Sequence, residues 1–394
     1  MTVTTTETRP AGSRPARLGW WRPVRIIAGL ELRQRIRATR WRISLAVMFA
    51  VVTAVVFGSF YFVLTVGGST YREWSANLYA IVVALVLFLG VIISPTLTAT
   101  AINGDRRDAT LAVVQATPIT NWQLATGKFL GSWVASMTLL VVALPYVLWG
   151  IVCAPFGVAS GFLGVVLVML IFACYCGVGL GFSALTARPA GSAILTQGTV
   201  LFLLLGLPAL FGLLYPAVSR DHQVTVASYG PYDPGLADRD PGYYPPCRDV
   251  EETRAYHHTE RTWWLLAPNP FLMVADAVGR TDPPNWTYIG TTTSPETTRF
   301  SVARPIAEAQ STARAGPFIE ERTCAEADFR LEFGPNGTET SYWERKRAHE
   351  SSFVGASWYI GLIVNLAIGG AGFLIAARRL RVPAGKLPRG VRIA

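Results

Sequence analysis

Few stretches of this sequence carry residue types that could bind a nucleotide or a metal, or catalyse a reaction. A phosphate-binding loop needs Gly-Lys followed by Ser or Thr, but the Gly-Lys pairs at 127–128 and 385–386 are followed by Phe and Leu. The His-His-Thr-Glu stretch at 257–260 lacks the His-Glu-x-x-His spacing of a metal site, so a solvated loop is the simpler interpretation. No Ser/His/Asp or Cys/His arrangement stands out. The sequence therefore predicts neither an enzyme nor a chain that itself binds ATP or a metal.

The composition is that of an integral membrane protein. Of the 394 residues, 51% are hydrophobic and only 15% are charged, which is more apolar than one soluble core of this length. Six uncharged runs of about 25 residues are each long enough to cross a hydrocarbon core of about 30 Å. They cover 43–66, 78–102, 129–153, 162–186, 193–218 and 353–377. We therefore predict an all-α membrane protein with six transmembrane helices.

The distribution of charge predicts how these helices are oriented. Residues 1–42 carry ten Arg against two Glu, and residues 378–394 carry six basic residues and no acid, so both termini are expected in the cytoplasm. Residues 219–352 carry 20 acidic and 14 basic residues and are expected outside, as an extracytoplasmic domain of mixed structure. The net charge of +10 therefore indicates basic ends at a membrane surface and no nucleic-acid partner. A multi-pass protein of the plasma membrane is predicted.

The predicted spans contain no Asp, Glu, Lys, Arg or His. Charged groups inside a membrane normally mark an ion or proton path, because each costs roughly 2.5 to 3.5 kcal/mol on insertion scales. Their absence argues against a carrier coupled to protons or ions. It leans toward a lipophilic or amphipathic cargo, with a large polymer as the alternative.

The stretch 20–42, just before the first predicted span, alternates Trp and aliphatic residues with Arg at roughly helical spacing. This pattern predicts an amphipathic helix on the inner leaflet, with Trp at headgroup level and Arg facing lipid phosphates. A basic flank that only stops translocation is the alternative.

The predicted outer domain holds two cysteines, Cys247 and Cys324. The other three lie in or at the end of spans, where a thiol behaves as a small apolar group. We therefore predict a disulfide between Cys247 and Cys324 in an oxidising compartment. The first third of the domain is rich in Pro, Gly and Tyr, which is typical of turns and short strands.

An apolar stretch at 263–278 is interrupted by Pro268, Pro270 and Asp276. A seventh span there would leave one terminus outside, against the basic residues at both ends. A segment lying in or dipping into the outer interface is the better interpretation, with Trp263 and Trp264 as its anchors.

Residues 103–128 form a half-polar island between the second and third spans. Asn103 and Asp105 suit the beginning of a helix, Leu111 gives that helix an apolar side, and Thr117-Pro118 ends it. A short amphipathic helix on the cytoplasmic surface is suited to docking in a groove of a partner, although it could also lie on the lipid.

The island resembles a motif of the permease subunits of type-2 ATP-binding-cassette (ABC) exporters. The family shows Glu-Arg-x-x-Gly-Thr-Leu-x-x-Leu-x-x-Thr-Pro and a later Gly-Lys, and residues 105–118 are Asp-Arg-Arg-Asp-Ala-Thr-Leu-Ala-Val-Val-Gln-Ala-Thr-Pro, before Gly127-Lys128. Asp105 replaces Glu and Ala109 replaces Gly, and these changes keep the sign of the charge and the length. The resemblance implies that the partner is contacted by Asp105, Arg106, Arg107, Asp108, Thr110, Leu111, Thr117 and Pro118.

Two further stretches are similar to this family. Glu31-Leu-Arg33-Gln-Arg35-Ile-Arg37 resembles its connecting helix, which lies before the first span. Asn269-Pro270-Phe271 resembles the Asn-Pro-Phe that precedes the last span.

The resemblance implies a dimer of permeases bound to two cytoplasmic ABC ATPases, which hold the ATP and magnesium. The domain boundaries then follow: a tail and connecting helix at 1–42, five spans at 43–218 with the coupling helix at 104–117, the outer domain at 219–352, the sixth span at 353–377 and a basic tail at 378–394. We expect export of a substrate. The alternative is a membrane scaffold or sensor that transports nothing and uses the same ATPase.

Overall fold

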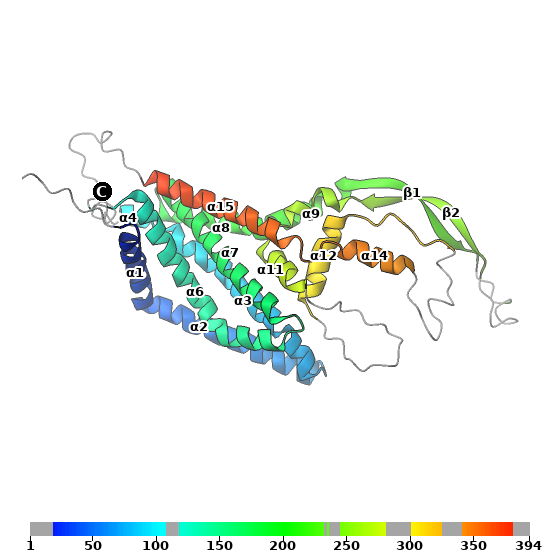
Figure 1. Ribbon diagram of the computed structural model, residues 1–394, viewed down its shortest axis with the longest axis horizontal. Helices are drawn as coiled ribbons and strands as arrows, with labels where there is room; N and C mark the ends of the chain where they lie inside the picture. Colours follow the sequence, from blue (N-terminus) through cyan, green and yellow to red (C-terminus); the bar gives the residue numbers. More distant parts are fainter. Residues whose placement is uncertain are drawn as a thin grey trace, which may run out of the picture.

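The computed structural model describes residues 19–107, 117, 119–231, 235, 245–280, 301–324 and 341–380. In this part of the chain, six helices are long and apolar enough to cross a membrane, which confirms the predicted number. They run over Trp41–Val66, Tyr71–Arg107, Asn121–Cys153, Val158–Leu185, Pro189–Leu214 and Trp358–Arg379. Figure 1 shows an elongated molecule with α1 and α4 at one end of the helix bundle and the strands β1 and β2 at the other.

The bundle is built from α-helices, two of which continue through a short π-helical segment. Its elements are α1 (Trp21–Arg37), α2 (Thr39–Tyr61) with η1 (Phe62–Val66), α3 (Tyr71–Ala99), α4 (Asn103–Arg107), α6 (Asn121–Cys153), α7 (Val158–Leu185), α8 (Pro189–Leu201) with η2 (Phe202–Gly206), α9 (Leu207–Leu214) and α15 (Trp358–Arg379). Two helices begin well before their apolar runs. The reason is a capping box in each case, Thr70 with Glu73 before α3 and Thr120 with Gln123 before α6, which satisfies the free N–H groups of a polar first turn.

Helix α7 lies at the centre of the bundle and packs against α3 and α15. Its contact with α15 is made by glycines, because a Cβ atom at Gly177 would lie 2.3 Å from the Gly369 carbonyl oxygen. One turn further on, a Cβ at Gly181 would lie 2.6 Å from the Cα of Gly372. In membranes, small residues let helix backbones approach closely and gain van der Waals contact. The two backbones therefore leave no room for a side chain here.

Replacing Gly177 by Ala is expected to destabilise the bundle by about 1–3 kcal/mol, because the added methyl group must push α15 away. Thermal unfolding in detergent measures this loss. Gly370→Ala is the matched control on α15, since no atom lies within 4 Å of a Cβ at that position. Equal melting temperatures for the two variants would contradict the close contact.

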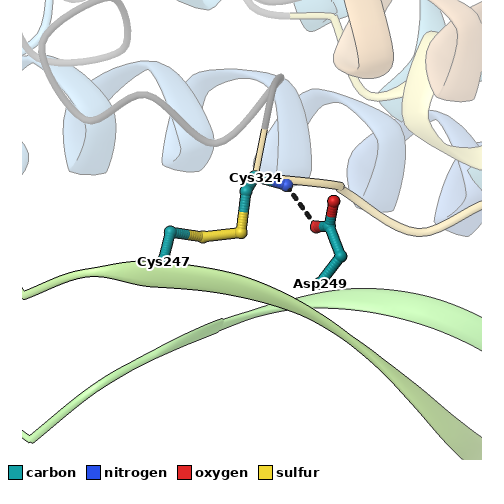
Figure 2. The surroundings of a disulfide bond; sticks show 3 residues. All are labelled: Cys247, Asp249 and Cys324. Atoms are coloured by element: carbon teal, nitrogen blue, oxygen red, sulfur yellow. Dashed lines mark hydrogen bonds between the residues drawn. A yellow bond between two sulfur atoms is a disulfide. The ribbon is translucent and has the colours of Figure 1, made fainter.

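The segment between α9 and α15 begins with a hairpin. Strands β1 (Ser219–Tyr229) and β2 (Cys247–His257) pair antiparallel, from Ser219 opposite His257 to Tyr229 opposite Cys247. Each strand has 11 residues, which is longer than the short strands predicted. Cys247 and Cys324 are joined by a disulfide, and the Cys324 N–H donates to the Asp249 carboxylate at 2.7 Å (Figure 2). The end of the hairpin that is farther from the bundle is thereby tied to residues 316–324, which follow α12.

Short helices connect this hairpin to the bundle. They are η3 (Pro216–Val218), η4 (Thr259–Arg261), η5 (Trp263–Leu265), α11 (Pro270–Gly279), α12 (Ala303–Ala315) and α14 (Ser341–Ser351). The expectation of a solvated loop at 257–260 was wrong. His258 is largely buried, its Nε2 lies 2.9 Å from His222 Nε2, and its Nδ1 lies 2.7 Å from a Glu260 carboxylate oxygen. Among the described residues, no group of three or more His, Cys, Asp or Glu is arranged to hold a metal ion.

The last spanning helix begins at Trp358, five residues later than the start of the apolar run. Residues before it form turns, and the buried carboxylate of Asp276 on α11 accepts the N–H groups of Gly355, Ser357 and Trp358 at 2.7–2.9 Å. This side chain takes the place of an N-cap for α15, since the N-cap residue Ser357 makes no capping hydrogen bond.

Candidate coupling site

The amphipathic helix α1 lies along the first turns of α6. Two glycines of α6 make this possible: a Cβ at Gly127 would lie 2.6 Å from Ile27 Cβ, and a Cβ at Gly131 would lie 2.7 Å from Glu31 Cβ. The contact continues at the start of α6, where Gln123 Nε2 donates to the Trp20 carbonyl at 3.3 Å. One side of α1 is therefore fixed to the helix bundle along most of its length.

Lys128 is the centre of a buried ionic cluster at this contact. Its ammonium lies 2.6 Å from a carboxylate oxygen of Glu31 on α1 and 2.6 Å from one of Asp105 on α4. The Lys128 side chain is only 6% exposed, so these two carboxylates replace most of its hydration. Because the three side chains come from three separate helices, one cation ties α1, α4 and α6 together.

Arg35 extends the cluster toward α3. Its guanidinium lies 3.6 Å from Glu31 and donates hydrogen bonds to the Leu97 carbonyl at 2.7 Å and to Ser132 Oγ at 3.2 Å. The neighbouring Arg33 and Arg37 are exposed. The four residues that the resemblance placed on the connecting helix thus fall into two pairs. Glu31 and Arg35 contact the helix bundle, whereas Arg33 and Arg37 lie on the surface.

Helix α4 is held against the ends of α7 and α15. Ser183 Oγ accepts the N–H groups of Ile102 and Asn103 at 2.9 and 3.2 Å. Arg106 donates to the carbonyls of Ala184 at 3.3 Å and Arg379 at 3.5 Å. Arg106 therefore contacts its own chain, and its expected contact with a partner stays a prediction.

Other residues of the predicted coupling helix are only partly described. Arg107 and Thr117 are exposed. Asp108, Thr110, Leu111 and Pro118 lie outside the described residues, so their contacts stay predictions. Beside the cluster is a cleft of about 510 Å³, with Glu31 and Arg35 on one wall and Asp105 and Arg107 on the other.

The ionic cluster and the contacts around it bring together three stretches that are far apart in the sequence. They are Glu31 and Arg35 before the first predicted span, Asp105 and Arg106 after the second, and Lys128 just before the third. A family model described as "ABC-2 family transporter protein" matches residues 25–231, more than half of the chain. The chain belongs to the ABC-2 family of transporter proteins. Membership implies a multi-pass membrane protein that associates with an ABC ATPase. Comparison with curated protein sequences finds no match to the chain.

The ABC-2 match begins within α1, runs through α9 and β1, and ends before β2. The second set of predicted site residues lies beyond it, at the hairpin end of the bundle. Asn269 caps α11 by accepting the N–H groups of Phe271 and Leu272, and its Nδ2 donates to the Leu204 carbonyl at 3.0 Å. That carbonyl is available because Pro208, four residues later, has no N–H. Asn269 therefore forms a structural joint between η2 and α11.

The two tryptophans of this ABC-2 chain differ in environment. Trp264 is 58% exposed, as an interfacial anchor would be, and its Nε1 donates to the Arg261 carbonyl. Trp263 instead lies beneath the guanidinium of Arg314, 4.5 Å from the ring centre. Neither residue belongs to the ionic cluster at the other end of the molecule.

Several residues that organise the ABC-2 fold were not identified from the sequence. Lys128 was noticed only as the end of a motif, and Asp276 only as an interruption of an apolar stretch. A signal existed in both cases, since a lone charge beside a long apolar run must find a buried partner or reach water. The sequence did not show which residues would pair with them, because the partners lie tens of residues away.

Proposed function

We propose that this chain is the membrane-spanning permease subunit of an ABC exporter, driven by ATP that a separate cytoplasmic subunit hydrolyses. The observation that supports the proposal best is the cluster of Lys128 with Glu31 and Asp105. It connects the stretch that resembles the coupling motif directly to the connecting helix and to a spanning helix. A force applied to residues 103–118 would therefore move more than a surface loop.

The proposed path of that force has two branches. In the first branch, Asp105 contacts Lys128 on α6, and Lys128 contacts Glu31 on α1; both contacts are 2.6 Å long. Arg106 leads to the ends of α7 and α15 through backbone carbonyls. Short charge-assisted contacts in a buried site resist stretching, so the helices they join are expected to move together.

The proposed topology has both termini and α4 in the cytoplasm and the segment 219–352 outside. It is supported by the basic residues at both ends, and by the disulfide, which suits an oxidising compartment. We expect the plasma membrane as the location. ATP and magnesium are expected on the partner ATPase, with no cofactor on this chain and no nucleic-acid partner.

A second permease is expected beside this one, giving twelve spans in the dimer. The first and fifth spanning helices are the least buried of the six. They expose large apolar side chains such as Phe57 and Tyr61 on α2 and Leu205 and Leu213 on η2 and α9. These surfaces are available to a second copy or to lipid. The uncharged spans favour a lipophilic or amphipathic cargo.

A scaffold or sensor that transports nothing is the second candidate. It is favoured by the hairpin, whose far end is held by the disulfide to Cys324 although no cargo path needs a long ordered arm. A hydrated path between two protomers would decide for export.

The test of the proposed function is charge reversal at Arg107, the exposed last residue of α4. Arg107→Glu is expected to weaken co-purification of the ATPase encoded with this chain by at least about tenfold, because a like or unpaired charge in an interface costs several kcal/mol. Arg248→Glu, an exposed reversal on β2 at the other end of the molecule, is the matched control.

Light scattering of the purified complex gives the stoichiometry, which we expect to be two permeases and two ATPases. Substrate-stimulated ATP hydrolysis in vesicles should fall with Arg107→Glu and stay unchanged with Arg248→Glu. Full co-purification and full stimulation in the Arg107 variant would overturn the proposal that α4 docks the ATPase.

A further inference from the structure

A cavity of about 270 Å³ lies between α3, α11 and the beginning of α12. Its walls include Val83 and Leu87 of α3, Phe271 and Val274 of α11, and Ile306 of α12. Of the described residues that line it, only Tyr79 has a polar side-chain group, and that hydroxyl already donates to the Gly161 carbonyl at 2.8 Å. The cavity therefore offers hydrocarbon contacts and no free hydrogen-bonding side chain.

The cavity lies at the depth of lipid tails. Near the hairpin end of α3, the rings of Phe60, Tyr71, Trp74 and Trp149 pack together with centroids 5.0–6.5 Å apart. Such aromatic groups gather at the boundary between headgroups and hydrocarbon. The lining residues 79–87 lie at the beginning of the second predicted span, 78–102, so they are within about 14 Å of its hairpin end at 1.5 Å per residue. That distance places them inside the hydrocarbon layer.

The cavity opens onto the exposed side of α3. Ala84 both lines the cavity and is exposed. It is followed at intervals of four residues by Phe88 and Ile92, which are 48% and 39% exposed. Residues four apart lie on one face of a helix, so these side chains form an apolar stripe that ends at the cavity. On the other side, the Val302 N–H donates to Asn77 at 2.9 Å and ties the start of α12 to α3.

We propose that this cavity binds one acyl chain of a membrane lipid, which enters from the lipid-facing stripe of α3. Water is a poor occupant, since it needs two to four polar partners, whereas an apolar cavity of roughly 150 Å³ already accommodates a benzene molecule. The bilayer surrounds the entrance with hydrocarbon chains at high local concentration. Recognition is by the chain, because no described lining residue is charged.

The proposed topology makes this an outer-leaflet lipid, and only that choice of leaflet rests on the proposed function. An occupied cavity would support α11 from the α3 side, while Asp276 on the same helix holds the start of α15. The bound chain therefore braces the joint between the outer segment and the last spanning helix.

Photo-crosslinking tests the site. The purified full-length chain, without any ATPase, is reconstituted in nanodiscs of phosphatidylcholine that carries a diazirine either near the end of one acyl chain or on the headgroup. Labelled peptides are mapped by mass spectrometry after illumination. Ala84→Phe and Ala275→Phe fill the cavity, and Ala367→Phe is the matched control, an exposed alanine on α15 that does not line it.

In the wild type, the tail probe is expected to label residues 79–87 and 271–278 preferentially. Labelling there should fall about tenfold in both cavity variants, the order expected when an apolar pocket loses room for a methylene or more, and stay unchanged in Ala367→Phe. Unfolding curves identify a variant that fails to fold, and the other then provides the test. Equal tail labelling in a folded cavity variant, or equal labelling by the headgroup probe, would overturn the proposal. Because no ATPase is present, this result is independent of the Arg107 test.

Discussion

Lys128→Met is expected to abolish ATP-driven transport and to lower the free energy of unfolding by about 3–5 kcal/mol. The substitution removes the ammonium that lies 2.6 Å from both Glu31 and Asp105. Two carboxylates are then left in a site where their side chains are only 16% and 32% exposed, with Arg35 3.6 Å from one of them. Removing one partner of a buried ionic group leaves an uncompensated charge, which is the costly change.

The measurements are thermal unfolding in detergent and substrate-stimulated ATP hydrolysis with the partner ATPase. Lys346→Ala, on α14, is the control for loss of a lysine that, among the described residues, has only a ring contact, with Trp343 at 5.5 Å, and should be within about 1 kcal/mol of the wild type. The triple variant Glu31→Gln, Asp105→Asn, Lys128→Met removes all three charges and should regain most of the stability. If the cluster transmits force as proposed, this variant folds and binds the ATPase but transports poorly. A fully active triple variant would contradict that role.

Asp276→Ala is expected to lower the free energy of unfolding by about 4 kcal/mol, because it leaves two buried N–H groups and one partly buried N–H group at the start of α15 without an acceptor. The carboxylate also lies at the positive end of that helix. Burial raises the pKa of Asp276, and the three N–H donors and Arg314 oppose the shift. Arg314 donates to Ala356 and Ser357 in the same turn, so it would lose its nearby negative charge.

Thermal unfolding measures the total loss, and hydrogen exchange of residues 351–360 measures the local opening of the start of α15. Asp276→Asn keeps one acceptor oxygen and should lose less than half as much stability as the alanine variant. Asp221→Ala, an exposed position on β1, serves as the control for loss of an aspartate. Unchanged exchange at 351–360 in Asp276→Ala would mean that this side chain does not hold α15.

The spans were predictable because they depend on local properties. Each of the six apolar runs is uncharged and about 25 residues long. In lipid, a helix satisfies the hydrogen bonds of its backbone within a single segment. Their ends were less predictable. α3 and α6 begin earlier because of capping boxes, and α15 begins later because a side chain from α11 caps it. The length of the hairpin strands was underestimated, because their Pro- and Gly-rich flanks suggested shorter strands.

By itself, the sequence determined that the chain spans a membrane, how many times it does so, and which stretches resemble the family motifs. Only the tertiary structure decided what those stretches do together. Lys128 and Glu31 are 97 residues apart, and Asp276 and Ser357 are 81 apart. The first pair meets because Gly127 and Gly131 let α1 approach α6 closely. The second meets because Gly361 and Asn365 of α15 lie against the backbone just before α11, and the periodicity of either helix alone does not specify its neighbour.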